Sequence, residues 1–277
     1  MSDPFFFEHD GTRLFGVTAA AEAPATGTVV VLCHPYAEEK QLTDRVLVRF
    51  ARHLAAAGYG TLRFDCLGYG ESAGHLGDGR LDTQVSEALA AVAVARERLA
   101  AARVVLLGLR LGGTVAALAA ERDSGVAGLV LWSPVLAGRT YVRELLRKKL
   151  AAQLALQDGT STREELIEII RREGRLEFEG GFLTAPMFDD LSAIDLSRQV
   201  TRFAGPVQVA TIRQRSENYG PSEMLATAYR TAGATCDVAI AGDREYWDVK
   251  SMFDGVFPEE LFAASLEWMR GHWPRAS

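Results

Sequence analysis

The segment 108–113, which reads GLRLGG, has the spacing of a nucleophile elbow. It follows the apolar run Arg103–Leu107 and precedes a helical pattern, with small residues two positions before and two positions after Arg110. In a G-x-S-x-G elbow, a tight turn tolerates only small neighbours and pushes the central side chain out above a sheet. Arginine is always protonated and is no nucleophile. The spacing therefore predicts the turn without the chemistry of a serine hydrolase.

Of the other two roles of a Ser-His-acid triad, the base role is vacant by residue type, and the acid role has no histidine to orient. In the fold that carries this elbow, the chain order is nucleophile, then acid, then histidine. The loop 242–247 after the last expected strand holds no histidine, and Glu245 is nearest the base position. Glu217, in the loop 215–218, is a candidate for the acid role but has no histidine to orient. We therefore expect a degenerate triad.

Two roles for Arg110 follow from its place at the start of a helix. Free N–H groups and the helix dipole favour an anion there, and a guanidinium binds carboxylate or phosphate through two parallel hydrogen bonds. Alternatively, Arg110 is a structural plug, held in an internal ion pair with Glu38, Glu217 or Glu245, because a buried cation without a partner is costly. The sequence leaves both roles open.

The loop after the first buried strand carries further candidates. His34 is the one imidazole expected near the site, either as a general base or as a support for the loop. Glu38 or Glu39 is expected to face Arg110, and with Glu245 would form an acid/base pair, although charges in a loop are most often solvated.

Substrate contacts are expected from several neighbouring positions. Tyr36 or Ala37, together with Leu111, could offer backbone N–H groups to an oxyanion. Ser133 lies at a strand end without elbow geometry, and Trp247 is expected to wall the pocket.

Cys66 is the other candidate nucleophile. It lies in a segment that resembles the structural D-x-x-G-x-G-x-S loop of α/β-hydrolases, and only His34 could act as its base.

Apolar runs of strand length alternate with helical patterns, which predicts a parallel sheet with right-handed crossovers. Strands are expected at Thr28–Cys33, Thr61–Asp65, Arg103–Leu107, Val126–Trp132, Val207–Ile212 and Thr235–Ala241, after a hairpin of Phe5–Glu8 and Arg13–Thr18. Helices are expected near Asp44–Ala57, Arg80–Ala101, Leu111–Glu121, Ser222–Ala232 and Glu259–Trp273. Ligands bind outside the carboxyl ends of such strands, where the candidates above lie.

The alternation breaks between residues 138 and 200. Two amphipathic helical stretches, Tyr141–Leu156 and Thr162–Gly174, precede a short β-like piece around Leu176–Leu183. This length and position predict a lid inserted into a single core made of residues 1–137 and 201–277. The basic cluster 143–149 is either a partner surface or a solvated helix face.

Composition narrows the class of protein. The chain has 277 residues, 48% of them hydrophobic, and a net charge of −6, so it can bury one large core and offers no basic face to nucleic acid. Three cysteines at unrelated spacings form no metal or disulfide pattern, and neither a signal peptide nor a membrane span is read. We expect a cytoplasmic protein with a small anionic ligand, no cofactor and no metal. A homodimer remains open.

Six segments resemble one known family, namely PFFFE, CHPYAEEK, GYGTLRFDCLGYGESAG, GLRLGG, LVLWSPVLAG and DREYWDV. Together they resemble the exosortase A system-associated hydrolases of the second type, a serine-aminopeptidase-like subgroup of α/β-hydrolases. The resemblance implies an α/β-hydrolase fold with about eight strands, and arginine at the elbow as a trait of the subgroup.

Two functions are compatible with these observations. One is modified chemistry on an acyl- or carboxylate-bearing small molecule through Arg110, with Glu245, Glu38 or His34 as acid or base. The other is an inactive pseudoenzyme that binds a ligand or partner in a biosynthetic or polysaccharide pathway.

Overall fold

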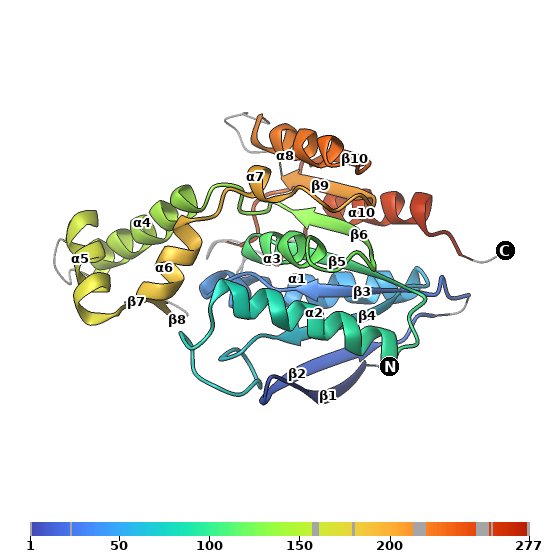
Figure 1. Ribbon diagram of the computed structural model, residues 1–277, viewed down its shortest axis with the longest axis horizontal. Coiled ribbons are helices and arrows are strands. Elements are labelled where there is room, and N and C mark those ends of the chain that lie inside the picture. The colour runs from blue at the N-terminus through green and yellow to red at the C-terminus, as the bar shows by residue number, and fades with distance from the viewer. Residues whose placement is uncertain are drawn as a thin grey trace.

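A computed structural model describes residues 2–22, 24–156, 161–178, 181–212, 220–247, 255 and 257–275. Its centre is an eight-stranded sheet in the order β1-β2-β4-β3-β5-β6-β9-β10 (Figure 1). The strands are β1 (Ser2–His9), β2 (Thr12–Ala19), β3 (Thr28–Cys33), β4 (Gly60–Asp65), β5 (Arg103–Leu109), β6 (Val126–Trp132), β9 (Val207–Ile212) and β10 (Cys236–Ala241). β1 and β2 pair antiparallel, and the six strands from β4 to β10 in the sheet order run parallel. The expected mostly parallel sheet is therefore present.

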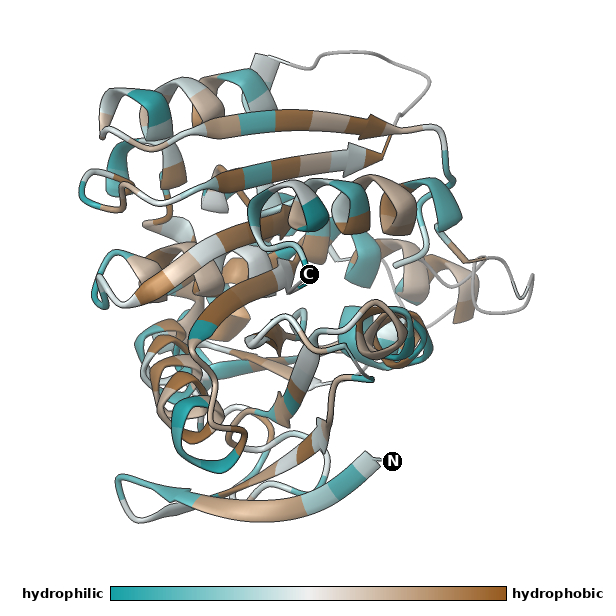
Figure 2. Cartoon of the chain, turned by 90° about the vertical axis from the view of Figure 1, so that its right-hand side faces the viewer, coloured by the Kyte–Doolittle hydropathy of each residue, from teal (hydrophilic) through white to brown (hydrophobic). Residues whose placement is uncertain are grey.

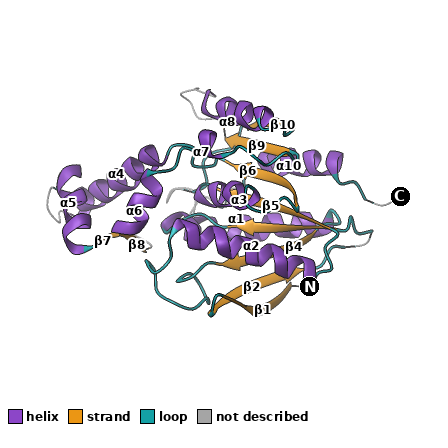
Figure 3. Ribbon diagram, in the orientation of Figure 1, coloured by secondary structure: helices purple, strands orange, loops and turns teal. Residues whose placement is uncertain are grey.

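Helices cover both faces of the sheet, as the alternation of strands and helices in Figure 3 indicates. They are α1 (Glu38–Ala56), α2 (Leu81–Arg98), α3 (Leu111–Ala120), α8 (Gly220–Thr231) and α10 (Glu259–His272). Successive side chains of a strand point to opposite faces, so Val29 and Val31 of β3 join the cluster with α2, α3 and α8. Val30 and Leu32 join the cluster with α1 and α10. This two-sided burial explains the uninterrupted apolar strands, brown in Figure 2.

One helix begins earlier than the apolar pattern predicts. α1 starts at Glu38 rather than near Asp44, although its first buried aliphatic side chain is Leu42. Acidic residues in a first turn are favoured by the helix dipole, which supports a start at Glu38 and Glu39. Both carboxylates therefore belong to a helix, and our placement of them in a loop was wrong.

The chain between β6 and β9 leaves the sheet, and most of it lies at the left of Figure 1. It contains α4 (Gly138–Leu156), α5 (Arg163–Glu173), a hairpin of β7 (Arg175–Phe178) and β8 (Gly181–Thr184), α6 (Ala185–Ser192) and α7 (Leu196–Gln199). Its two ends meet at a β-bridge between Ala137 and Asp195, and the Gly138 N–H donates to the Ile194 carbonyl at 2.9 Å. We call residues 138–195 the lid.

The lid is packed onto the core through apolar side chains. Leu145 and Leu146 of α4 and Leu166 of α5 belong to the same buried cluster as Val31 and Leu106 of the central strands. Within the ranges described, no helix is long and apolar enough to cross a membrane.

Candidate functional site

The turn that carries Arg110 joins β5 to α3 and is as tight as its glycines suggest. Arg110 has φ 54° and ψ −121°, a conformation that side-chain-bearing residues rarely adopt. A Cβ atom at Gly108 would lie 2.1 Å from the carbonyl oxygen of Gly112, and one at Gly112 would lie 2.2 Å from that of Cys33. Only glycine fits at these two positions, so the expected tight turn is present.

The guanidinium of Arg110 is buried between two carboxylates and two aromatic rings. Its Nε donates to Glu39 Oε1 at 3.2 Å, and its Nη2 donates to Glu144 Oε2 at 2.9 Å. Its Cζ lies 5.4 Å from the ring centre of Tyr141 and 5.2 Å from that of Trp247, within the range of cation–π attraction. The Arg110 side chain is 15% exposed and that of Glu39 only 3%.

The electrostatics of Arg110 follow from these contacts. Burial by itself opposes the charge, but Glu39, Tyr141 and Glu144 outweigh it and raise the pKa of Arg110 above its ordinary value. The cation is therefore firmly held, and its three charged or hydroxyl partners come from α1 and α4.

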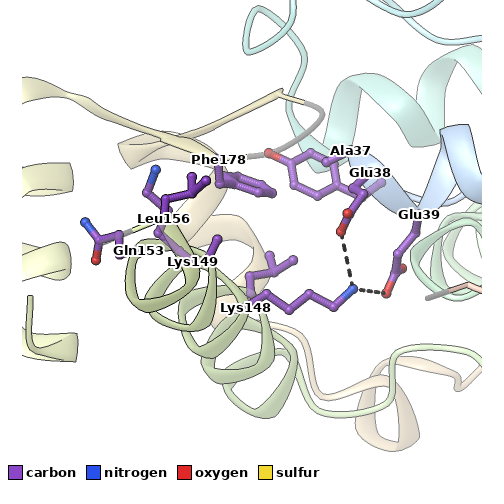
Figure 4. A pocket seen from close by; sticks show the side chains of 11 residues that line it. Ala37, Glu38, Glu39, Lys148, Lys149, Gln153, Leu156 and Phe178 are labelled. Carbon is purple, nitrogen blue, oxygen red and sulfur yellow. Dashed lines mark ion pairs between the residues drawn. The ribbon is translucent and has the colours of Figure 1, made fainter. Parts of the chain in front are cut away.

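The lid supplies further contacts to the same carboxylate. Tyr141 donates its hydroxyl to Glu39 Oε2 at 3.1 Å. Lys148 Nζ lies 3.9 Å from Glu39 Oε1 and 3.7 Å from Glu38 Oε2 (Figure 4). We call these interacting residues the core–lid clasp: Arg110 and Glu39 from the core, and Tyr141, Glu144 and Lys148 from α4.

One of the carboxylates expected to face Arg110 does so, and a second carboxylate reaches it from α4. Glu39 faces Arg110, whereas the ion pair of Glu38 is with Lys148. Glu245 is half-buried in the loop after β10. Glu217 lies outside the described residues. Glu144 was not anticipated as a partner, although its spacing of three residues from Tyr141 and four from Lys148 places all three on one face of a helix.

His34 is bound through both ring nitrogens. Its Nδ1–H donates to the carbonyl of Pro35 at 2.7 Å, and its Nε2 accepts the N–H of Cys66 at 3.1 Å. Burial and the nearby Lys40 lower the pKa of His34 to about 4. With no ring nitrogen left for a substrate, the geometry contradicts the general-base role and favours the support of the loop.

The expected oxyanion donors are also engaged in part. The N–H of Ala37 donates to the Tyr69 hydroxyl at 3.1 Å, which removes it as a donor to a ligand. Tyr36 and Leu111 are both buried, and the hydroxyl of Tyr36 donates to the Phe182 carbonyl of β8 at 2.6 Å. Tyr36 thus ties the loop to the lid.

Neither Ser133 nor the candidate nucleophile Cys66 has a catalytic setting. Ser133 is half-buried at the end of β6, and its N–H donates to the Ala210 carbonyl at 2.8 Å. The thiol of Cys66 is buried, and burial together with Glu87 raises its pKa well above the ordinary value. A thiol is a nucleophile only as the thiolate, so Cys66 is not activated.

A pocket of about 120 Å³ lies between α4 and the N-terminal end of α1. Apolar side chains make up much of its wall, namely Tyr36, Ala37, Leu145, Ala152, Leu156 and Phe178. Its polar lining consists of Glu38, Glu39, Lys148, Lys149 and Gln153. The pocket reaches the clasp at Glu39 without being lined by Arg110. Among the residues that the structure describes, no group of three acidic, histidine or cysteine side chains could hold a metal ion.

Comparisons with known proteins agree with this architecture. Residues 24–178 match the model of the Hydrolase_4 family, described as serine aminopeptidase, S33. No curated protein matches the sequence.

Solved structures match over nearly the whole chain. Est1E from Butyrivibrio proteoclasticus with bound ferulic acid has a TM-score of 0.71 at 18% identity, covering 97% of this chain and 98% of its own. The α/β-hydrolase GrgF from Penicillium sp. sh18 has a TM-score of 0.67 at 18% identity, covering 99% of each chain. The Pyrococcus furiosus esterase Pf2001 has a TM-score of 0.65 at 16% identity, covering 98% of this chain and 91% of its own. These likenesses show an α/β-hydrolase fold.

Proposed function

Because the chain belongs to the Hydrolase_4 family of serine aminopeptidase-like proteins, we propose that it uses this fold to bind a small acyl- or carboxylate-bearing molecule without serine-dependent hydrolysis. One observation carries the proposal. The elbow side chain is Arg110, and its guanidinium is bound by Glu39 and Glu144 and lies against Tyr141 and Trp247. These contacts fill the place where a nucleophile would meet a substrate.

The ion pairs favour a structural plug over a ligand anchor. A ligand carboxylate could reach the guanidinium only by displacing Glu39, which is 3% exposed, or Glu144, which is 40% exposed. Displacing Glu39 would leave its charge buried with Tyr141 as its remaining hydrogen-bond donor, and such a charge is strongly destabilising. Displacing Glu144 costs less free energy but leaves Arg110 bound to Glu39. We therefore assign ligand binding to the neighbouring pocket.

Labelling with a serine-directed fluorophosphonate probe tests the absence of serine chemistry. We expect no labelling and no hydrolysis of p-nitrophenyl esters, with an active α/β-hydrolase esterase as the positive control. Stoichiometric labelling that disappears in Ser133→Ala, or in Ser216→Ala in the segment next to Glu217, would instead identify a serine enzyme and overturn the proposal.

Restoring a serine at the elbow makes a second test. Arg110→Ser is expected to leave ester hydrolysis at background, because no histidine stands in the loop after β10 to take the proton of the hydroxyl. Hydrolysis well above that of the wild type would mean that a base exists elsewhere, and would restore the enzyme alternative with Glu245 as the first residue to mutate.

A further inference from the structure

We propose that one edge of the central sheet, formed by β10 with α8 beside it, is the interface at which two copies of this chain form a symmetric dimer. In this dimer, β10 pairs antiparallel with β10 of the partner subunit, and the two α8 helices face each other across the same twofold axis. This interface is independent of the proposed function, which concerns a small ligand and the elbow at Arg110.

β10 is one of the two edge strands of the sheet, at the top of Figure 1, and no described strand pairs with its outer side. The Val207 N–H of β9 donates to the Thr235 carbonyl at 2.8 Å. Because alternate residues of a strand direct their backbone groups to opposite sides, residues 235, 237, 239 and 241 pair with β9. The N–H and C=O groups of Cys236, Val238 and Ile240 therefore point outward, and such a row is a template for another strand.

The opposite edge strand, β1, carries residues that hinder pairing with another strand. Pro4 has no N–H to donate, and Asp3 and Glu8 are exposed charges on the same strand. β10 reads CDVAIA, with no proline and with Asp237 as its one charged residue. Ile240 of β10 is 42% exposed, although isoleucine is among the residues most often buried. The sequence thus protects the β1 edge and leaves β10 suited to a partner.

Antiparallel pairing centred on Val238 matches the outward groups of both copies. Val238 would exchange two hydrogen bonds with Val238 of the partner subunit, and Cys236 would lie opposite Ile240 of the partner subunit. The Cys236 carbonyl already accepts from Arg230 Nη2 at 2.7 Å. The hydrogen bonds that the dimer adds are therefore those of the central Val238 pair and those from the Cys236 N–H to the Ile240 carbonyl.

The side chains of β10 on the α8 face are apolar. Val238 packs against the cluster that contains Leu225 and Tyr229 of α8. Ile240, two residues further along the strand, points to the same face and would contact Cys236 of the partner subunit. Pairing would therefore remove apolar surface of Ile240 from water, which favours association.

The charges on α8 fit the same twofold axis. Glu223, Thr227 and Arg230 are exposed and lie on one face of the helix, because they are spaced by four and three residues. Arg230 donates to the outward carbonyl of Cys236, so this face is on the side of the β10 edge.

In the dimer, α8 of the partner subunit runs antiparallel to α8. Glu223 then lies opposite Arg230 of the partner subunit, Arg230 lies opposite the partner's Glu223, and Thr227 is near the axis. Within one copy, Arg230 Nη1 and Glu223 Oε2 are 3.5 Å apart, and the side chains stay 47% and 56% exposed. Each can therefore take a second partner. A surface that is complementary to itself in charge and in hydrogen bonds favours a second copy of this chain over an unrelated protein.

Sedimentation velocity of the full-length protein over a range of concentrations tests the proposal. We expect a monomer–dimer equilibrium, in which a species of twice the mass of one chain grows with concentration. Ile240→Lys places a charge on the edge strand and should raise the Kd of the dimer by about tenfold or more. Leu154→Lys, at a leucine of α4 that is 63% exposed, is the matched control and should change the Kd by less than about twofold. A wild-type protein that stays monomeric into the submillimolar range, or a dimer that Ile240→Lys leaves unchanged, would overturn the proposal.

Charge reversal on α8 tests the position of the axis. Glu223→Arg and Arg230→Glu each place like charges opposite one another, so each variant alone should dimerise about tenfold more weakly than the wild type. A mixture of the two variants again has opposite charges at both contacts and should form heterodimers with close to the wild-type Kd. A side chain that only stabilises its own subunit would not produce this recovery. A mixture that associates no better than either variant alone would contradict the twofold pairing of α8 and overturn the proposed interface.

Discussion

At the scale of the residue, the main feature of the site is the largely buried guanidinium of Arg110. Arg110 stands in a strained turn, yet its guanidinium has two carboxylate partners and two aromatic neighbours. A buried ion pair is of uncertain net benefit to stability, but removing one partner is costly because the other charge stays buried. Glu39 is the residue that would be left.

Arg110→Ala should therefore lower the free energy of unfolding by about 3–5 kcal/mol, as measured by urea denaturation. Adding Glu39→Gln in the same chain should recover much of that loss, because the buried carboxylate, left with only Lys148 at 3.9 Å as a cationic partner, is then neutral. Arg147→Ala, at an exposed position of α4, is the control and should stay within about 0.5 kcal/mol of the wild type. A loss below about 1 kcal/mol for Arg110→Ala would argue against a plug and for a ligand anchor.

The protonation of His34 is a second residue-scale prediction. The pKa of His34 is lowered to about 4 in the folded protein, against an ordinary value of 6.5. The unfolded chain therefore takes up this proton at higher pH than the native protein does. The stability that neutral His34 contributes is fully present above about pH 6.5 and is lost as the pH falls toward 4. A ¹⁵N NMR titration should find the imidazole neutral at pH 5. A midpoint near 6.5 would contradict a buried ring that is hydrogen-bonded through both nitrogens.

At the scale of the element, α4 explains how the lid is held. Tyr141, Glu144 and Lys148 lie on one face of the helix because their spacing is close to whole turns. This polar face meets Arg110 and Glu39 of the core, while Leu145 of the same helix packs into the apolar cluster. The helix is thus both the wall of the pocket and the attachment of the lid.

Loosening this attachment should be visible in hydrogen exchange. Tyr141→Phe/Glu144→Gln removes two of the contacts that α4 makes with Arg110 and Glu39 of the core, and we expect faster amide exchange in α4 with little change in β5 and β6. Arg143→Gln is a matched control, because Arg143 is exposed and its side chain donates a hydrogen bond to Thr140 within the same helix. Unchanged exchange in the double variant would mean that apolar packing alone holds the lid.

At the scale of the whole molecule, core and lid share one apolar cluster. Leu145 and Leu166 of the lid are buried together with Val31 and Leu106 of the central sheet. The lid leaves and re-enters the core at one stem, where Ala137 and Asp195 pair. Shared packing of this kind favours unfolding as one unit.

Calorimetric unfolding should accordingly show a single transition, with a van't Hoff enthalpy close to the calorimetric enthalpy. Near-UV dichroism, which reports aromatic packing such as that of the buried Trp132, should follow the same curve as far-UV dichroism. Two resolved transitions would show that the lid unfolds separately from the core.

Local patterns sufficed for the fold and for the turn at Arg110. Uninterrupted apolar runs such as Thr28–Cys33 indicate strands buried on both faces, and glycines at 108 and 112 indicate a turn too tight for side chains, because both signals arise from neighbouring residues. The apolar pattern did not predict the start of α1, because the first turn of this helix carries charged residues and no apolar ones.

Tertiary structure alone decided what surrounds Arg110. Sequence made an acidic partner necessary, since a buried guanidinium needs one, and it included Glu39 among the candidates. It did not identify Glu144 or Tyr141, which lie more than thirty positions further along the chain in the lid. Which side chains meet across such a distance depends on how the lid docks on the sheet, and that docking is set by the packing of apolar faces and not by any local pattern.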